Sequence, residues 1–186
     1  MDVLLEATEI VLSQRGFAGA TTNHIADAAG VSIGTLYHYF PSKESLVEAV
    51  VHRMWARELG VLEVHAEALA NGPLEDAIRA IVRDLVAVMA ARQMLYRRWY
   101  AEASHLGRLD EGLEITARAV AAVRAAFERN VSRLRPRNVA FAADLVVKLA
   151  LAMVRTGARD YEREVASGEL ASELGDVIVR YLLRDA

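Results

Sequence analysis

The side chains that could carry catalytic chemistry are few and scattered along this chain of 186 residues. Five histidines stand at positions 24, 38, 52, 65 and 105, and no two have the His-Glu-x-x-His spacing that binds zinc. Glu63, His65 and Glu67 are two residues apart, which places His65 on a different helix face from the glutamates. The chain also lacks cysteine, a glycine-rich phosphate loop and a Gly-x-Ser-x-Gly motif. We therefore predict that it is not an enzyme and binds no metal or cofactor.

Polar rings gather in one short stretch, residues 33–40, which reads IGTLYHYF. Aromatic residues make up only 6% of the chain, so such a cluster stands out. Leu36 and Phe40 fit a buried face of a helix. The Tyr-His-Tyr sequence at 37–39 cannot point inward as a whole from so short a segment. Some of these rings are therefore expected at the surface, where they need a function.

Two short helices are expected on either side of a tight turn, at residues 22–29 and 33–40. The three residues between them, Gly30-Val31-Ser32, give the spacing of a helix-turn-helix. Gly30 can adopt the left-handed backbone conformation that this turn needs. Thr21 and Thr22 offer hydroxyl groups that can cap the first of the two helices. The pattern alone fits DNA binding and a simple helical hairpin equally well.

The rest of the chain is also predicted to be helical. Apolar residues recur every three or four positions, and proline occurs only three times. This periodicity predicts an all-α fold of about nine helices. Helices are expected at 3–14, 22–29, 33–40, 42–70, 74–90, 92–104, 110–133, 138–166 and 169–184. They divide into a small module at residues 1–45, with three helices and the helix-turn-helix, and a larger helical domain at 46–186.

The composition limits the classes of function. Hydrophobic residues make up 54% and charged residues 25%, as in soluble globular proteins. The chain opens without a basic leader, and Asp144 and Lys148 interrupt its longest apolar tract, 139–154. We therefore expect a cytoplasmic protein with no membrane partner. Residues 1–50 hold two basic and six acidic residues, and this balance counts against nucleic-acid binding.

A dozen positions at fixed spacing nevertheless favour DNA binding. They lie in Gly16-Phe17, Thr21-Thr22, Ile25-Ala26, Ala29-Gly30-Val31-Ser32, Gly34-Thr35-Leu36-Tyr37, Tyr39-Phe40 and Ser42-Lys43-Glu44-Ser45-Leu46. Together, over residues 4–47, they resemble the DNA-binding module of the TetR (tetracycline-repressor) family. This resemblance implies a homodimeric, sequence-specific transcriptional regulator, usually a repressor, that binds a palindromic operator and is released by a small-molecule effector. It also implies that residues 46–186 form the ligand-binding and dimerisation domain.

The resemblance further implies that helix 33–40 enters the major groove of double-stranded DNA. The expected DNA-binding residues are Thr21, Thr22, Ser32, Ile33, Gly34, Thr35, Tyr37, His38, Tyr39 and Lys43. Tyr37 and Tyr39 would hold the DNA backbone, His38 a base or a phosphate, and Lys43 a phosphate. The alternatives are a packing role for Tyr37 and a merely solvent-exposed His38. Because this module has fewer basic residues than is usual in the family, we expect its DNA affinity to depend weakly on salt.

The segment 138–161 has apolar residues on two helix faces, so both faces must be buried. Small residues recur every seventh position on one of them and allow close helix packing. We predict a homodimer built on 138–161 and 169–184, and the alternative is a monomeric bundle with a central helix. The predicted interface residues are Val139, Ala143, Val146, Ala150, Met153, Gly157, Leu170, Leu174, Val177 and Tyr181.

A pocket for a largely apolar effector is expected among the helices between residues 74 and 161. Methionine and aromatic side chains suit apolar ligands, although they are more often plain core residues. The candidates are Met89, Met94, Tyr96, Trp99, Tyr100, His105 and Phe127. An alternative reading of the whole chain is a repressor-fold protein that binds a ligand or a protein partner without binding an operator.

Overall fold

The computed structural model of the chain describes residues 1–102 and 110–184. In this part of the chain it contains ten α-helices and one short 3-10 turn, with no strand. The helices are α1 (Asp2–Gly19), α2 (Thr22–Ala29), α3 (Ile33–Tyr39), α4 (Lys43–Asn71), α5 (Leu74–Ala90), α6 (Gln93–Glu102), α7 (Asp110–Arg129), α8 (Val139–Asp160), α9 (Glu162–Ser167) and α10 (Glu169–Leu182). The predicted all-α fold is confirmed.

Two of the expected helices end earlier than the apolar periodicity indicated. The segment 138–166 is split at Tyr161, whose backbone angles (φ −132°, ψ 48°) are not helical. This break turns the chain back, so that Leu170 packs on Gly157, where an added Cβ would lie 2.8 Å from Leu170 Cδ2. The segment 110–133 ends as a helix at Arg129 and continues as the 3-10 turn η2 (Val131–Arg133).

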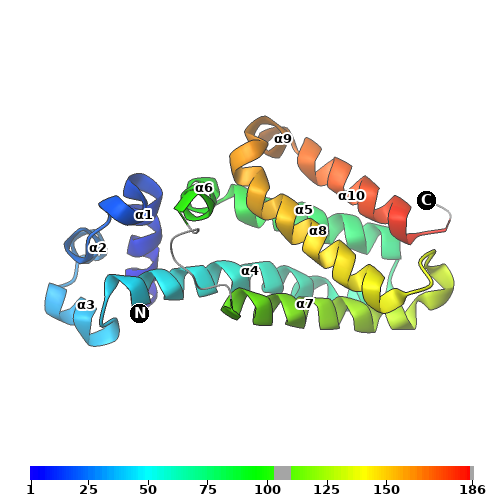
Figure 1. The fold of residues 1–186 in the computed structure, drawn as a ribbon, viewed down its shortest axis with the longest axis horizontal. Helices are drawn as coiled ribbons and strands as arrows, with labels where there is room; N and C mark the ends of the chain where they lie inside the picture. Colours follow the sequence, from blue (N-terminus) through cyan, green and yellow to red (C-terminus); the bar gives the residue numbers. More distant parts are fainter. Residues whose placement is uncertain (103–109, 185–186) are drawn as a thin grey trace.

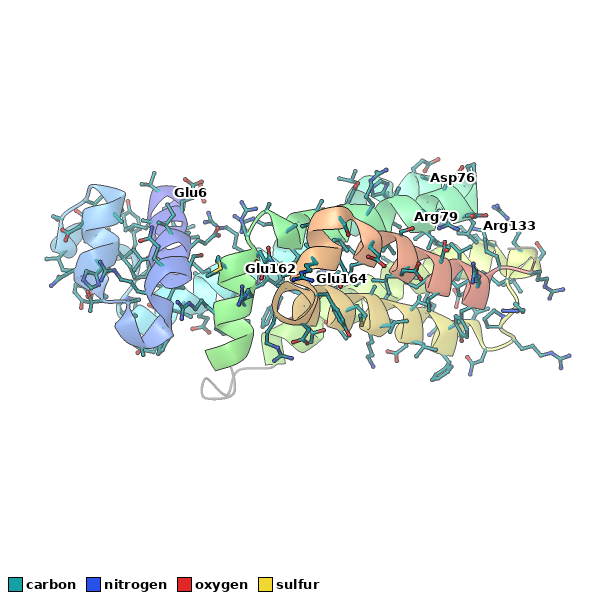
Figure 2. All side chains as sticks on the ribbon, turned by 90° about the horizontal axis from the view of Figure 1, so that it is seen from above. Glu6, Asp76, Arg79, Arg133, Glu162 and Glu164 are labelled. Carbon is teal, nitrogen blue, oxygen red and sulfur yellow. The ribbon has the colours of Figure 1, made fainter. Side chains whose placement is uncertain are left out.

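The molecule is elongated, with α1, α2 and α3 at one end and the remaining helices extending away from them (Figure 1). Helix α4 connects the two parts. Its first turns pack against α1, and its later turns pack against α5 and α7. Seen from above, Glu6 of α1 lies in the part with the helix-turn-helix, and Arg133 of η2 lies toward the opposite end of the molecule (Figure 2). Residues 43–71 therefore form a rigid connection rather than a flexible linker.

Helix α6 is the second element between the two parts. It packs against α1 on one side and against α8 on the other. The body is closed by α10, which lies along α5, and Arg79 of α5 binds Asp176 of α10 there. Among the described residues, no helix combines the length and the apolar character that a membrane crossing requires.

Candidate nucleic-acid interface and ligand cavity

The helix-turn-helix is built by local backbone contacts. Thr21 Oγ1 accepts a hydrogen bond from the backbone N–H of His24 (3.2 Å) and caps α2. Gly30 ends α2 with φ +67°, so the predicted left-handed glycine is confirmed. Ser32 Oγ accepts from the backbone N–H of Thr35 (3.0 Å) and caps α3. Gly30 and Ser32 thus define the turn between α2 and α3, and Thr21 fixes the start of α2.

Apolar side chains hold α3 against the module and leave its other faces in solvent. Leu36 is completely buried and Phe40 nearly so. The hydroxyls of Tyr37 and Thr22 are 3.1 Å apart, which joins α3 to the N-terminus of α2. The position of Tyr37 is compatible with both a packing role and a DNA contact, because Tyr37 contacts α2 and yet is 48% exposed.

Nine of the ten expected DNA-binding residues are at least partly exposed and lie on or next to α2 and α3. Ile33, Tyr37 and Tyr39 are the exposed large side chains among them. His38 and Tyr39 pack edge to face, with ring centroids 5.2 Å apart. The nine residues are Thr21, Thr22, Ser32, Ile33, Gly34, Thr35, Tyr37, His38 and Tyr39. This surface presents hydroxyl, imidazole and methyl groups and no lysine or arginine of α2 or α3.

Lys43, the tenth residue, has partners inside the protein. Its Nζ donates to the backbone carbonyls of Phe17 (3.0 Å) and Ala20 (3.2 Å). It also lies 4.2 Å from the centroid of the Phe17 ring. Two of its three donors therefore close the loop after α1, so its predicted phosphate contact would depend on the third.

A cluster of charges joins the module to the body, and sequence reasoning missed it. Glu9 of α1 accepts from Arg53 Nε (2.9 Å) and Arg57 Nη1 (2.9 Å), both on α4. Its other oxygen accepts from Arg92 Nε (3.2 Å), just before α6. Burial by itself raises the pKa of Glu9, but the hydrogen bonds from Arg57 and Arg53 outweigh it and lower that pKa overall. The sequence signal that could have revealed this cluster is the position of Glu9 next to Thr8 and Leu12 on the apolar face of α1.

The body contains a cavity of about 60 Å³ between α4, α5, α7, α8 and α10. Its walls are mainly aliphatic, and Phe127 supplies an aromatic ring. The lining residues are Glu58, Leu59, Leu62, Leu69, Ile78, Ile81, Val82, Leu85, Ile115, Ala119, Val123, Phe127, Val146, Val147, Ala150, Leu151, Arg155, Ile178 and Leu182. Such a concave, apolar site with few polar groups has the character of a small-molecule pocket.

The polar groups of the cavity wall form one buried cluster. Glu58 has a side chain that is only 2% exposed. One of its oxygens accepts from Tyr96 Oη (3.1 Å), and the other accepts from Nε (3.2 Å) and Nη2 (2.7 Å) of Arg155. The cluster therefore ties α4 to α6 and α8.

Of the seven residues expected to form the pocket, Phe127 lines this cavity. Tyr96 reaches it through its bond to Glu58. Met89 is fully buried in the core, Trp99 is half-buried and Met94 is 48% exposed, and none of the three lines the cavity. The side chain of Tyr100 and the whole of His105 lie outside the described residues. The aliphatic walls, Glu58 and Arg155 were missed, because aliphatic residues at helical spacing do not distinguish a cavity from a core.

The predicted dimer residues are placed mostly in the interior of the chain itself. Val146 and Ala150 line the cavity, and Gly157 allows the close approach of Leu170. Those buried in this way are Ala143, Val146, Ala150, Gly157, Leu170 and Leu174, whereas Val139, Met153 and Tyr181 are partly buried and Val177 is 53% exposed. The small residues thus serve packing within one chain, and the assignment of the buried six to an interface with a partner has to be corrected.

A different face of α8 is open to a partner. Phe141 (57% exposed), Leu145, Lys148 and Ala152 form a stripe spaced by four, three and four residues. This spacing follows one side of a helix. Val177 supplies an exposed apolar side chain on α10.

Comparison with known proteins agrees with this geometry. Residues 4–50 match the profile of "Bacterial regulatory proteins, tetR family", and residues 73–182 match "Tetracyclin repressor-like, C-terminal domain". An all-helical protein with an exposed helix-turn-helix and a separate helical body belongs to the class of helix-turn-helix regulators. Since the two matches together cover most of its length, this chain belongs to the TetR family.

The sequence similarity to individual curated relatives lies mainly in the DNA-binding module. The HTH-type transcriptional repressor KstR2 of Rhodococcus jostii is 44% identical over 48 residues, which is 26% of this chain and 24% of that protein. The HTH-type transcriptional repressor KstR of Mycobacterium tuberculosis is 39% identical over 54 residues, or 29% of this chain and 24% of that protein. The match thus spans about a quarter of the length of these curated relatives.

Solved structures share the whole fold at low identity. The TetR family transcriptional regulator PfmR from Thermus thermophilus has a TM-score of 0.67 at 23% identity, covering 99% of this chain and 100% of that one. The transcriptional regulator FadR from Bacillus subtilis, in complex with stearoyl-CoA, has a TM-score of 0.74 at 15% identity, covering 97% and 98%. At this identity the likeness concerns the fold alone.

Proposed function

We propose that the protein is a transcriptional regulator that binds an operator in double-stranded DNA through α3 and is released from it by a small molecule. The observation that carries the proposal is the capped helix-turn-helix whose second helix exposes Ile33, Thr35, Tyr37 and His38. A helix of this kind enters the major groove with its first turns toward the base edges. The repressors KstR2 and KstR, similar over this module, support repression as the direction of control. Such a protein would act in the cytoplasm, where its operator lies.

We further propose that it acts as a homodimer on a palindromic operator. The exposed stripe of Phe141, Leu145 and Ala152 on α8, with Val177 on α10, supplies an apolar surface for a second copy. A two-fold dimer presents two copies of α3 and so matches two half-sites separated by about one helical turn of DNA or a multiple of it.

The cavity is the proposed effector site. An effector must favour a form of the protein in which the two copies of α3 are placed wrongly for the operator. The fold of FadR, solved in complex with stearoyl-CoA, supports ligand binding by this architecture. In the present chain the cavity borders α4 and is tied to α6, and both of these helices contact α1.

The test is a selection of bound duplexes from a random DNA pool by the purified protein. We expect one palindrome to be enriched. On that duplex, the slope of log affinity against log salt should be small, about −2 to −4 per dimer, since each phosphate neutralised contributes roughly −0.9. The structure favours this low value because Lys43, Arg53 and Arg57 are already bound within the protein.

One observation favours a second candidate function. The first 50 residues carry a net charge of −4, and the exposed surface of α2 and α3 has no basic side chain. If no duplex is enriched even at low salt by folded protein, the chain would be a ligand or protein binder with a repressor fold. Thr35→Ala and Tyr37→Ala should abolish enrichment if the first proposal is correct, whereas exposed Glu173→Ala at the other end should not affect it.

A further inference from the structure

The residues that line the cavity are spread along the body rather than grouped at one point. On α7 they recur at every fourth position from Ile115 to Phe127, and on α4 they extend from Glu58 to Leu69. Since a helix rises about 1.5 Å per residue, these two sets cover roughly 16 to 18 Å. Helices α4 and α7 pack against each other and run along the long axis of the molecule (Figure 1). The cavity therefore extends along this axis.

The volume of the cavity is small for such a length. A compact cavity of about 60 Å³ would be only about 5 Å across and would face one or two turns of each helix. The same volume holds roughly four to six water-sized groups, each about 2.8 Å wide. In single file these groups reach roughly 11 to 17 Å, which is close to the length of the lining. Length and volume agree when the cavity is a narrow channel that is one chain of atoms wide.

The wall of this channel can hold an apolar chain but offers it few directional bonds. Apart from the ring of Phe127 and the charged Glu58 and Arg155, the described lining residues are leucine, isoleucine, valine and alanine. A ligand therefore gains affinity mainly from the apolar surface that it buries against these side chains. Each methylene buried in this way raises the affinity about three- to fourfold. The affinity is thus greatest for an apolar ligand that extends over the whole length of the channel.

Resting on the proposed function, we propose that the effector carries one unbranched alkyl chain that lies lengthwise in the channel. Carbon–carbon bonds of about 1.5 Å in a staggered zigzag advance about 1.25 Å each, so the channel takes roughly nine to thirteen carbons. A branched or fused-ring ligand with the same number of carbons is wider than the channel. Such a ligand can enter only if packed helices move apart, and close-packed interiors resist this change.

The experiment is a calorimetric titration of the wild-type protein, without DNA, with 1-hexanol, 1-octanol, 1-decanol and 1-adamantanol. The last two contain the same number of carbons, in an extended chain and in a compact cage. We expect the affinity to rise about three- to fourfold per methylene from 1-hexanol to 1-decanol. We also expect 1-decanol to bind at least about tenfold more tightly than 1-adamantanol. The proposal is overturned if the cage binds as tightly as the chain or more tightly, if the affinity does not rise with chain length, or if no alcohol binds.

A variant that narrows the channel tests whether the chain lies in it. Ala150 of α8 is buried, and the lining residues of this helix extend on both sides of it, from Val146 to Arg155. Ala150→Leu divides the channel near its middle, so 1-decanol should lose at least about tenfold in affinity. The shorter 1-hexanol fits on one side of the leucine and should lose at most about threefold. Exposed Ala140→Leu on the same helix is the matched control and should leave both affinities unchanged.

A second variant introduces the same side chain from another helix. Ala119→Leu, on α7, should also lower the ratio of the 1-decanol affinity to the 1-hexanol affinity. A ratio that stays at the wild-type value in a folded Ala150→Leu protein would contradict the proposal. If circular dichroism shows that neither variant folds, the wild-type series alone decides.

The failure of this inference and the failure of the proposed function can be told apart. The titrations report binding to the cavity without any operator. Release of the selected duplex by 1-decanol is a separate measurement on the same protein. Tight binding of 1-decanol without duplex release would uphold the ligand class and contradict the regulatory function. Release by 1-adamantanol but not by 1-decanol would uphold the function and contradict the ligand class.

Discussion

Two carboxylates with little exposure, Glu9 in the module and Glu58 in the body, are bound by arginines in different ways. Three arginines surround Glu9, so its cluster carries excess positive charge. Glu58 is bound by Arg155 and by the uncharged Tyr96. The first carboxylate has three cationic partners, whereas the cationic partner of the second among the described residues is Arg155, next to the cavity. We therefore expect the Glu9 cluster to tolerate the loss of one partner better than the Glu58 cluster does.

The same two helices contact both carboxylates. On α4, the consecutive residues Arg57 and Glu58 have different partners, since Arg57 binds Glu9 and Glu58 binds Arg155 of the body. At α6, Arg92 binds Glu9 and Tyr96 binds Glu58. We therefore expect a shift of α4 or α6 that changes one cluster to affect the other. The contacts of Glu9 and Glu58 thus connect the cavity to α1, which packs against the helix-turn-helix.

Removing Glu58 should have the largest effect on stability. Glu58→Ala removes the carboxylate that binds both Arg155 and Tyr96, from a position where the Glu58 side chain is only 2% exposed. We expect a loss of about 3 kcal/mol in the free energy of unfolding, as for other broken buried pairs. Urea unfolding followed by circular dichroism measures it. Exposed Glu63→Ala should stay within about 0.5 kcal/mol of the wild type, and a loss of that size for Glu58→Ala would contradict the comparison.

Neutralising Glu9 should have a smaller effect that depends on pH. Glu9→Gln keeps the shape but loses charge-assisted hydrogen bonds, for an expected loss of about 2 kcal/mol at pH 7. Because the pKa of Glu9 is lowered in the folded state, its stabilisation is complete above the pKa of an unfolded glutamate, about 4.3. It declines as the pH falls toward the lower folded value.

The measurement is urea unfolding of wild type and Glu9→Gln at several values between pH 7 and pH 3. The difference between the two proteins should be constant at the upper end and shrink at the lower end. Glu6→Gln, at an exposed position on the same helix, is the control and should show no comparable difference. A Glu9 effect that grows as the pH falls would be opposite to the expected sign.

Local signals explain which parts of the fold could be predicted from the sequence. The caps, the left-handed Gly30 and the exposed rings at 37–39 depend on neighbours within a few residues. The split at Tyr161 has no comparable signal, since no proline or glycine stands at the break. It follows from the packing of Leu170 on Gly157, which lies thirteen positions away along the chain.

The sites of the body depend on contacts that the sequence does not show. The cavity is lined from five helices, and each contributes residues that would fit an ordinary core. Two apolar faces of α8 were recognised from the sequence, and the chain itself buries residues of both, Ala143, Ala150 and Gly157 on one and Val147, Leu151 and Val154 on the other. The exposed side with Phe141 and Leu145 belongs to neither of these faces and was missed.

The hydroxyl of Tyr96 provides a finer test of the contacts that Glu58 makes. Tyr96→Phe removes one hydrogen bond to Glu58 and leaves the bond to Arg155 in place. We expect a loss of about 1 to 2 kcal/mol, since the lost bond involves a buried charged acceptor. The half-buried Trp99→Phe on the same helix is a control for changes in aromatic packing. Equal losses in the two variants would show that the hydroxyl has no particular role.

Removing one arginine from Glu9 should have the smallest effect. Arg92→Gln takes away the longest of the three contacts (3.2 Å), and Arg53 and Arg57 still bind the carboxylate. Because Arg92 is also partly solvated, the expected loss is about 0.5 kcal/mol. Urea unfolding of Arg92→Gln, Arg57→Gln and the double variant shows whether the arginines can replace one another or whether each contact is weak by itself. If the partners are redundant, the double variant loses clearly more than the sum of the single losses. If the losses simply add, Glu9 has no surplus of partners, and the contrast with Glu58 reduces to a difference in burial.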